Sequence, residues 1–124
     1  MGHLLLIGAG GFAGATTRYL VDGRVAAWAG TSFPWGTLAV NLAGSLLVGI
    51  LFATIVERAA LAPELRGPLM IGFIGSFTTF STWALESWRM VEDGAWLYAG
   101  LNLGGSLLLG LAAVVAGIAI GRAI

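Results

Sequence analysis

The sequence contains no cysteine, a single histidine and few charged residues among its 124 positions. The absence of cysteine excludes disulfides, thiol chemistry and thiolate metal sites. A single histidine leaves no cluster of side chains with metal-ligand spacing. The formal net charge is zero, which argues against a nucleic-acid partner because such proteins carry clustered cationic residues. These absences argue against a thiol-based redox protein and against a metalloenzyme.

Because only 10% of the residues are charged, long uncharged runs remain, at positions 1–17, 26–56, 67–85 and 94–121. A helix of about 20 apolar residues crosses a bilayer. The hydrophobic content of 58% and the mean hydropathy of +0.93 are typical of membrane proteins. We therefore expect an all-α integral membrane protein, with one four-helix domain over residues 1–124 and spans near 3–27, 35–56, 68–90 and 95–120.

The first run is expected to be a retained helix and not a signal peptide. It has no Lys or Arg before the apolar stretch, and Arg18 lies where a cleavage region would be. Small residues recur in it at spacing four, which favours close packing against neighbouring helices, at Gly10 with Gly14 and at Gly11 with Ala15. Arg18 itself has two interpretations, an anchor at the membrane interface or a guide for an anion entering a vestibule.

The third run contains the most unusual segment, residues 72–83, which combines glycines, hydroxyls and aromatics. This mixture is not typical of a continuous lipid-facing helix. Backbone groups left unpaired in hydrocarbon are costly, so a break at this depth needs partners for them. Gly72 and Gly75 loosen a helix, and the neighbouring hydroxyls can satisfy the groups that a break frees. We predict that the third helix is broken in mid-membrane, where an ion can use the freed carbonyls.

Polar and small residues form a stripe on the second span, at Thr37, Asn41, Ser45 and Gly49. A similar stripe on the fourth span contains Tyr98, Asn102 and Ser106. An amide in the membrane is costly when unpaired, so Asn41 must face protein or a water-filled path. A hydrogen bond between helices and an ion path are equally compatible with this pattern.

Two larger-scale patterns concern symmetry. Positions 35–49 recur in part at 96–110, which is compatible with an internal two-span repeat of residues 1–62 and 63–124. The arginines divide equally between the two ends of the spans, with Arg58, Arg66 and Arg122 on one side and Arg18, Arg24 and Arg89 on the other. Without a positive-inside bias we expect insertion in both directions. An antiparallel dual-topology homodimer can then form about a twofold axis in the membrane plane.

The residue types available suit an anion path better than a catalytic centre. Such a path needs hydrogen-bond donors without a deep trap, and amides, hydroxyls and the positive edges of aromatic rings supply them. Phe77, Phe80 and Trp83 could offer such edges, although packing between helices is the alternative for any aromatic spacing of this kind. Enzymatic activity is not expected, because no His, Lys or Asp lies near the hydroxyls to activate them.

Three motifs carry a family resemblance. They are Gly11-x-x-Gly14-Ala15-x-x-Arg18-Tyr19, then Gly36-Thr37-Leu38-x-Val40-Asn41-x-x-Gly44-Ser45, then Gly72-Phe73-x-Gly75-x-x-Thr78-Thr79-Phe80-Ser81-Thr82 followed by Glu86. Together they resemble the Fluc (CrcB) family of bacterial fluoride channels across all four spans. The resemblance implies an antiparallel dual-topology homodimer that exports cytoplasmic fluoride passively across the bacterial inner membrane and so reduces fluoride toxicity.

The resemblance also implies site residues. A structural sodium ion at the dimer interface would be held by the backbone carbonyls of Gly75 and Thr78. The fluoride pathway would include Asn41, Phe80, Ser81, Thr82, Thr37 and Glu86, with Arg18 in the vestibule. Two pathway positions depart from the family pattern: Trp83 stands where a second phenylalanine is usual, and Asn102 where a tyrosine is often present. Tryptophan keeps the ring edges and adds an N–H donor.

The nearest rival function is a small multidrug antiporter, which is also a dual-topology protein of four helices. Exchange of protons for cationic drugs needs a carboxylate deep in the membrane. Spans one, two and four have none in their interiors, and Glu86 lies near the end of span three. A membrane scaffold is the other rival, but it does not explain the polar stripes.

Overall fold

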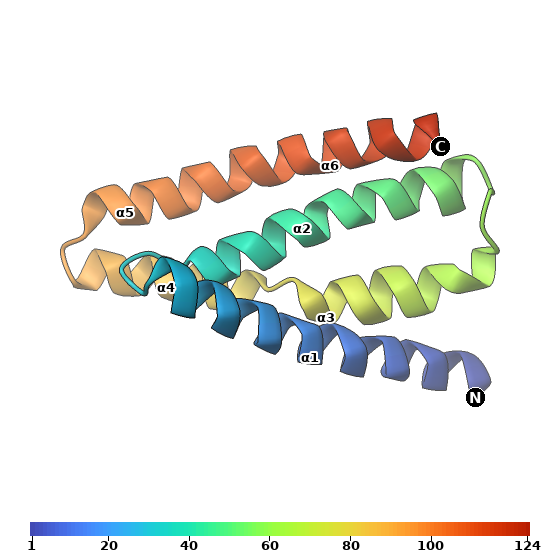
Figure 1. Ribbon diagram of the computed structural model, residues 1–124, viewed down its shortest axis with the longest axis horizontal. Coiled ribbons are helices and arrows are strands. Elements are labelled where there is room, and N and C mark those ends of the chain that lie inside the picture. Colours follow the sequence, from blue (N-terminus) through green and yellow to red (C-terminus); the bar gives the residue numbers. More distant parts are fainter.

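The computed structural model describes all residues from Met1 to Ile124 and contains helices but no strands. Four long helical spans run side by side along the molecule (Figure 1). Each is long and apolar enough to cross a membrane, and they comprise Gly2–Ala29, Trp35–Glu57, Pro63–Glu92 and Trp96–Ala123. The prediction of an all-α chain with four membrane-spanning helices is confirmed, and the chain is a multi-pass membrane protein.

Only the first span is a single uniform helix, α1 (Gly2–Ala29). The other spans join α-helical, 3₁₀ and π-helical segments end to end. The second contains α2 (Trp35–Leu51) and the π-helix η1 (Phe52–Glu57). The third span contains η2 (Pro63–Leu65), η3 (Gly67–Ile74), α3 (Gly75–Phe77) and α4 (Phe80–Glu92). The fourth span contains α5 (Trp96–Gly100), η4 (Leu101–Gly105) and α6 (Ser106–Ala123).

Helix α1 covers residues 2–29, against an expected span of 3–27, and so continues well past the uncharged run of residues 1–17. Arg18, which follows that run directly, lies inside the helix and is half-buried. Asp22 follows one turn later in the helix, and both side chains line the same cavity. The helix ends at Gly30, whose φ of 86° favours a residue without a side chain.

Glycines set the contact between α1 and η3. A Cβ on Gly10 would collide with the Pro68 carbonyl, and one on Gly14 would collide with the Phe73 carbonyl. From the other side, a Cβ on Gly72 would lie 2.5 Å from the Ile7 carbonyl oxygen. The two backbones are therefore in direct contact, as small-residue packing allows. The prediction of a close-packing face at Gly10 and Gly14 is confirmed.

A second glycine contact joins α2 to α6, which lie alongside each other for most of their length (Figure 1). Gly49 faces the Val114 carbonyl, and Gly117 faces the Leu46 carbonyl. In both places an added Cβ would meet backbone atoms, which cannot move aside as a flexible side chain could. The sequence pattern did not identify Gly117 as an interface residue.

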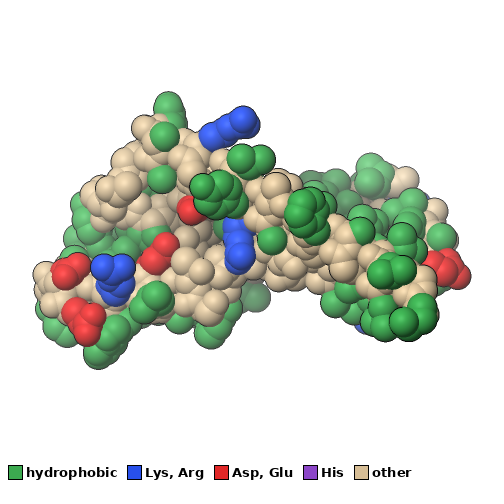
Figure 2. Space-filling view, turned by 90° about the horizontal axis from the view of Figure 1, so that it is seen from below, with side chains coloured by type: hydrophobic (Ala, Val, Ile, Leu, Met, Phe, Trp, Pro, Cys, Tyr) green, Lys and Arg blue, Asp and Glu red, His purple; other side chains and the backbone are tan.

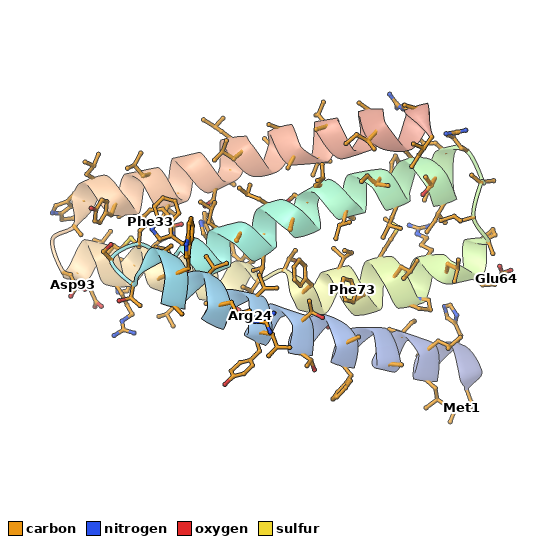
Figure 3. All side chains as sticks on the ribbon, viewed as in Figure 1. Met1, Arg24, Phe33, Glu64, Phe73 and Asp93 are labelled. Atoms are coloured by element: carbon orange, nitrogen blue, oxygen red, sulfur yellow. The ribbon has the colours of Figure 1, made fainter.

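Several charged residues lie at the two ends of the bundle. Met1 and Glu64 lie at one end and Asp93 lies at the other (Figure 3). In the view of Figure 2, acidic side chains gather towards the two ends, and hydrophobic side chains occur along the whole length. Near the carboxyl terminus, Arg122 forms two hydrogen bonds to the Glu57 carboxylate, at 2.7 and 2.8 Å, and Arg58 donates to the Gly121 carbonyl at 3.0 Å.

Candidate functional site

The third span is interrupted between α3 and α4. Thr78 has φ −86° and ψ 160°, and Thr79 has φ −149° and ψ 114°, so both are extended. The helix resumes at Phe80. The interruption lies within the segment singled out from the sequence, but at the two threonines and not at the glycines. Gly72 serves a different purpose, because it is the point at which η3 packs against α1.

Asn41, on α2, binds the backbone of this interruption through both ends of its amide. Its Nδ2 donates to the Thr79 carbonyl at 3.1 Å, and its Oδ1 accepts the Thr79 N–H at 2.8 Å. In a continuous helix that N–H would bond to the Gly75 carbonyl four residues earlier. One side chain therefore satisfies both polar groups of an extended residue, and the structure shows Asn41 making a hydrogen bond between helices.

Hydroxyl groups stabilise the two helix ends at the interruption. The Thr79 Oγ1 accepts the Thr82 backbone N–H at 3.3 Å and donates to the Thr82 Oγ1 at 2.9 Å. Thr79 is thus the N-cap of α4. The Thr78 Oγ1 donates to the Ile74 carbonyl at 3.0 Å. These bonds are of the kind that we expected the hydroxyls of this segment to make.

The interruption leaves carbonyl groups without their helical partners. The Thr78 carbonyl accepts no hydrogen bond, and the N–H that would reach the Gly75 carbonyl is bound to Asn41. Gly75 is exposed on the surface of this chain and Thr78 is partly exposed. Carbonyl oxygens at a broken helix are suitable ligands for a sodium ion. The residues present at Gly75 and Thr78 therefore fit such an ion.

Three cavities near this region share lining residues from one to the next. A groove of about 360 Å³ is lined by Asn41, Ser45, Thr78, Thr79 and Phe80, among others. A second cavity of about 220 Å³ shares Thr79 with it, and a third of about 330 Å³ shares Asp22 with the second. The series leads from the end of the bundle that holds Asp93 to the interruption in the third span.

The middle cavity contains the predicted vestibule residue. Arg18 lines it together with Asp22, Thr37 and Thr82. The Thr37 Oγ1 donates to Glu86 Oε1 at 2.9 Å, whereas the buried Glu86 Oε2 has no hydrogen-bond partner. Glu86 also lines the outermost cavity. Arg18, Thr37 and Thr82 thus line the middle cavity, and Glu86 lines the outermost one and is bound to Thr37.

Phe80 and Trp83 are neighbours with very different surroundings. Their ring centroids lie 5.1 Å apart with the planes tilted by 48°. The Phe80 side chain is 76% exposed and lines the groove, whereas Trp83 is 9% exposed. Ser81 is exposed on α4 and makes no side-chain hydrogen bond within the chain. Of these three residues, only Phe80 lines the groove beside Asn41.

Asn102 lies away from that groove, fully buried against α4. Its backbone carbonyl accepts the Trp83 indole N–H at 2.9 Å, and its Nδ2 donates to the Ser87 Oγ at 2.9 Å. Ser87 was not identified from the sequence. Its position four residues after Trp83 was the one available signal, because that spacing places two residues on the same face of a helix.

Comparison with known proteins identifies the family. The family model described as CrcB-like protein, Camphor Resistance (CrcB), matches residues 5–118. A protein named fluoride-specific ion channel FluC from Maridesulfovibrio salexigens is 45% identical over 124 residues, which cover 100% of this chain and 98% of that protein. A protein of the same name from Hahella chejuensis is 47% identical, and the alignment covers 98% of this chain and 96% of that protein. Another from Chlorobaculum tepidum is 48% identical, and the alignment covers 94% of this chain and 92% of that protein. From these matches over nearly its whole length, the chain belongs to the CrcB family.

Proposed function

We propose that this protein is a fluoride channel that lets cytoplasmic fluoride leave the cell passively through the bacterial inner membrane. The observation that carries the proposal is the series of cavities that passes Arg18, Thr37 and Thr82 and reaches Asn41 and Phe80. It occurs in a chain whose relatives bear the name of fluoride-specific channels. A channel of this kind moves ions down their gradient and needs no catalytic group.

The side chains at the inner end of this route suit a small anion. The Asn41 amide uses one N–H for the Thr79 carbonyl, so its second N–H is available to the groove. The exposed Phe80 ring offers its positive edge. Each is a weak donor, and neither carries a full positive charge. An ion can therefore be attracted into the groove and still leave it.

The route is open on the surface of one chain, and a second copy would close it. Phe80 lines the groove and is exposed, as is Gly75, which follows the groove-lining Ile74. Large apolar side chains such as Ile71 and Leu85 are exposed on the same span. We propose that the partner inserts in the opposite direction, because the arginines are equally divided between the two ends. The assembly would be an antiparallel, dual-topology homodimer about a twofold axis in the membrane plane.

This arrangement would put the interruption at Thr78 and Thr79 in mid-membrane and at the dimer axis. The carbonyls of Gly75 and Thr78 from both copies would then face one another, and would supply four oxygen ligands for a structural sodium ion. The fit rests on the unpaired Thr78 carbonyl and on the diversion of the Thr79 N–H to Asn41. A bound ion would neutralise carbonyl dipoles that otherwise face each other in hydrocarbon.

The test is ion efflux from liposomes that contain the purified protein, followed with fluoride and chloride electrodes. We expect fast fluoride efflux, little chloride efflux, and loss of fluoride efflux in Phe80→Ile. Phe12→Ile is the matched control, because Phe12 on α1 is 77% exposed but lies outside the cavities. A folded protein without fluoride efflux, or equal effects of the two substitutions, would contradict the proposal.

Insertion direction is tested separately with a terminal tag and a reagent that does not cross the membrane. Dual topology predicts that the reagent labels the tag from both sides of the membrane in similar amounts. Labelling from one side alone would exclude the antiparallel dimer. The result does not depend on whether the protein conducts ions.

A further inference from the structure

The indole N–H of Trp83 is already bound. It donates to the Asn102 carbonyl at 2.9 Å in a buried environment, and the same carbonyl accepts the Ser106 backbone N–H. Both lone pairs of that oxygen are therefore in use. Asn102 lies in η4, a π-helical segment of the kind that occurs frequently at functional sites. A donor held in this way is not available to an anion in the groove.

The Asn102 side chain completes a closed ring of hydrogen bonds around Trp83. Its Nδ2 donates to the Ser87 Oγ at 2.9 Å, and the Ser87 Oγ donates to the Trp83 backbone carbonyl at 2.8 Å. On the other side, the Ser106 Oγ donates to Asn102 Oδ1 at 3.3 Å. The indole N–H of Trp83 is thus bound to the Asn102 backbone carbonyl, while the Trp83 backbone carbonyl is linked through Ser87 to the Asn102 side-chain amide. Asn102 is 0% exposed and Ser87 is 3% exposed, so no water competes for these bonds.

The fixed indole in turn supports the exposed Phe80 ring. The two centroids are 5.1 Å apart with a tilt of 48°, a geometry in which rings attract each other. Within its own chain Phe80 has little other support, since it is 76% exposed. We propose that Asn102 and Ser87 are positioning residues for fluoride passage, which fix Trp83 and thereby the orientation of Phe80. This inference rests on the proposed function and assigns Asn102 an indirect role in place of direct contact with the ion.

A double-mutant cycle tests the indirect role. Asn102→Leu removes the amide with little change of shape, and we expect fluoride efflux to fall about tenfold, because the effect of a lost buried contact is transmitted through Trp83. In a Trp83→Phe background the indole that this network positions is absent, so the same Asn102→Leu change is expected to slow efflux less than about twofold. Equal losses in the two backgrounds would overturn the proposal, because they would mean that Asn102 acts on the ion without Trp83.

A spectroscopic measurement tests the positioning without any ion flux. Trp83 becomes the sole tryptophan when the other four, which are exposed, are replaced by phenylalanine, namely Trp28, Trp35, Trp88 and Trp96. We expect Asn102→Leu and Ser87→Ala to shift the Trp83 emission to longer wavelength and to increase its quenching by acrylamide. Leu103→Ala, next to Asn102 but 40% exposed, is the matched control and should change neither.

The two experiments separate the possible failures. Unchanged Trp83 emission in a folded Asn102→Leu dimer would overturn the positioning role, whatever the efflux. Absent fluoride efflux from the unmodified protein would overturn the proposed function, while the emission comparison would still decide whether Asn102 fixes the indole. Size-exclusion chromatography of each variant establishes that the comparison is between folded dimers.

Discussion

Two regions of the bundle are held together in different ways. Along α1 with η3, and along α2 with α6, glycines bring backbones into direct contact, as at Gly14 and Gly117. Around the interruption in the third span, side chains of one helix bind the backbone of another, as Asn41 binds Thr79. The first kind of contact depends on the volume of a residue, and the second depends on its donors and acceptors. Substitutions should therefore fail for different reasons in the two regions.

The largest effect is expected from Gly117→Leu. The new Cβ would collide with the Leu46 carbonyl, and the rest of the side chain would force α6 away from α2. We expect a loss of about 3–5 kcal/mol in the free energy of unfolding, or no folded protein at all. Gly104→Leu is the control on the same span, because a Cβ there meets no atom within 4 Å. Similar unfolding midpoints in detergent for both variants would contradict the volume argument.

The next largest effect is expected from Asn41→Leu, which leaves both polar groups of Thr79 unpaired. Each unpaired buried group costs about 1–3 kcal/mol, so for two groups we expect a loss of about 2–6 kcal/mol in unfolding free energy. Asn41→Asp keeps the acceptor for the Thr79 N–H and should leave a dimer. Its negative charge faces the groove and should abolish fluoride efflux. Undiminished efflux in Asn41→Asp would remove Asn41 from the mechanism.

A smaller effect is expected from Thr79→Val, which removes the N-cap oxygen of α4. The lost bond to the Thr82 N–H should cost about 1 kcal/mol of unfolding free energy. Thr79→Ser retains the hydroxyl and is the matched control. If thermal unfolding of the valine and serine variants is indistinguishable, the hydroxyl does not support the interruption.

The smallest effect is expected from Glu57→Gln at the end of the bundle. The substitution removes the ion pair with Arg122, whose side chain is 61% exposed. Exposed pairs of this kind contribute little because water and salt screen them. We expect an unchanged unfolding midpoint at both low and high salt. A marked, salt-sensitive loss would mean that this pair matters as much as the interior hydrogen bonds.

Local sequence features predicted part of the site. The mixture of hydroxyls and glycines in residues 72–83 indicated an interrupted helix, and the spacing of Gly10 and Gly14 indicated a packing face. The exact position of the interruption could not be predicted from these features. Gly72 packs against α1, and the extended residues are instead Thr78 and Thr79, of which Thr79 is bound by Asn41. The hydrogen-bond partner of Asn41 could not be predicted either, because Thr79 lies 38 positions away in the chain.

What the sequence determined by itself was the number of spans and their approximate bounds. Apolar runs of sufficient length indicate this locally, because the hydropathy and length of a stretch can be read without knowing what it packs against. Only the tertiary structure decided which polar groups pair. Asn102 had been expected beside the ion path with Trp83, and the structure binds the two together in a buried network. Hydrogen bonds act over about 3 Å, so their partners follow from how the helices are rotated and packed, which no single stretch of sequence specifies.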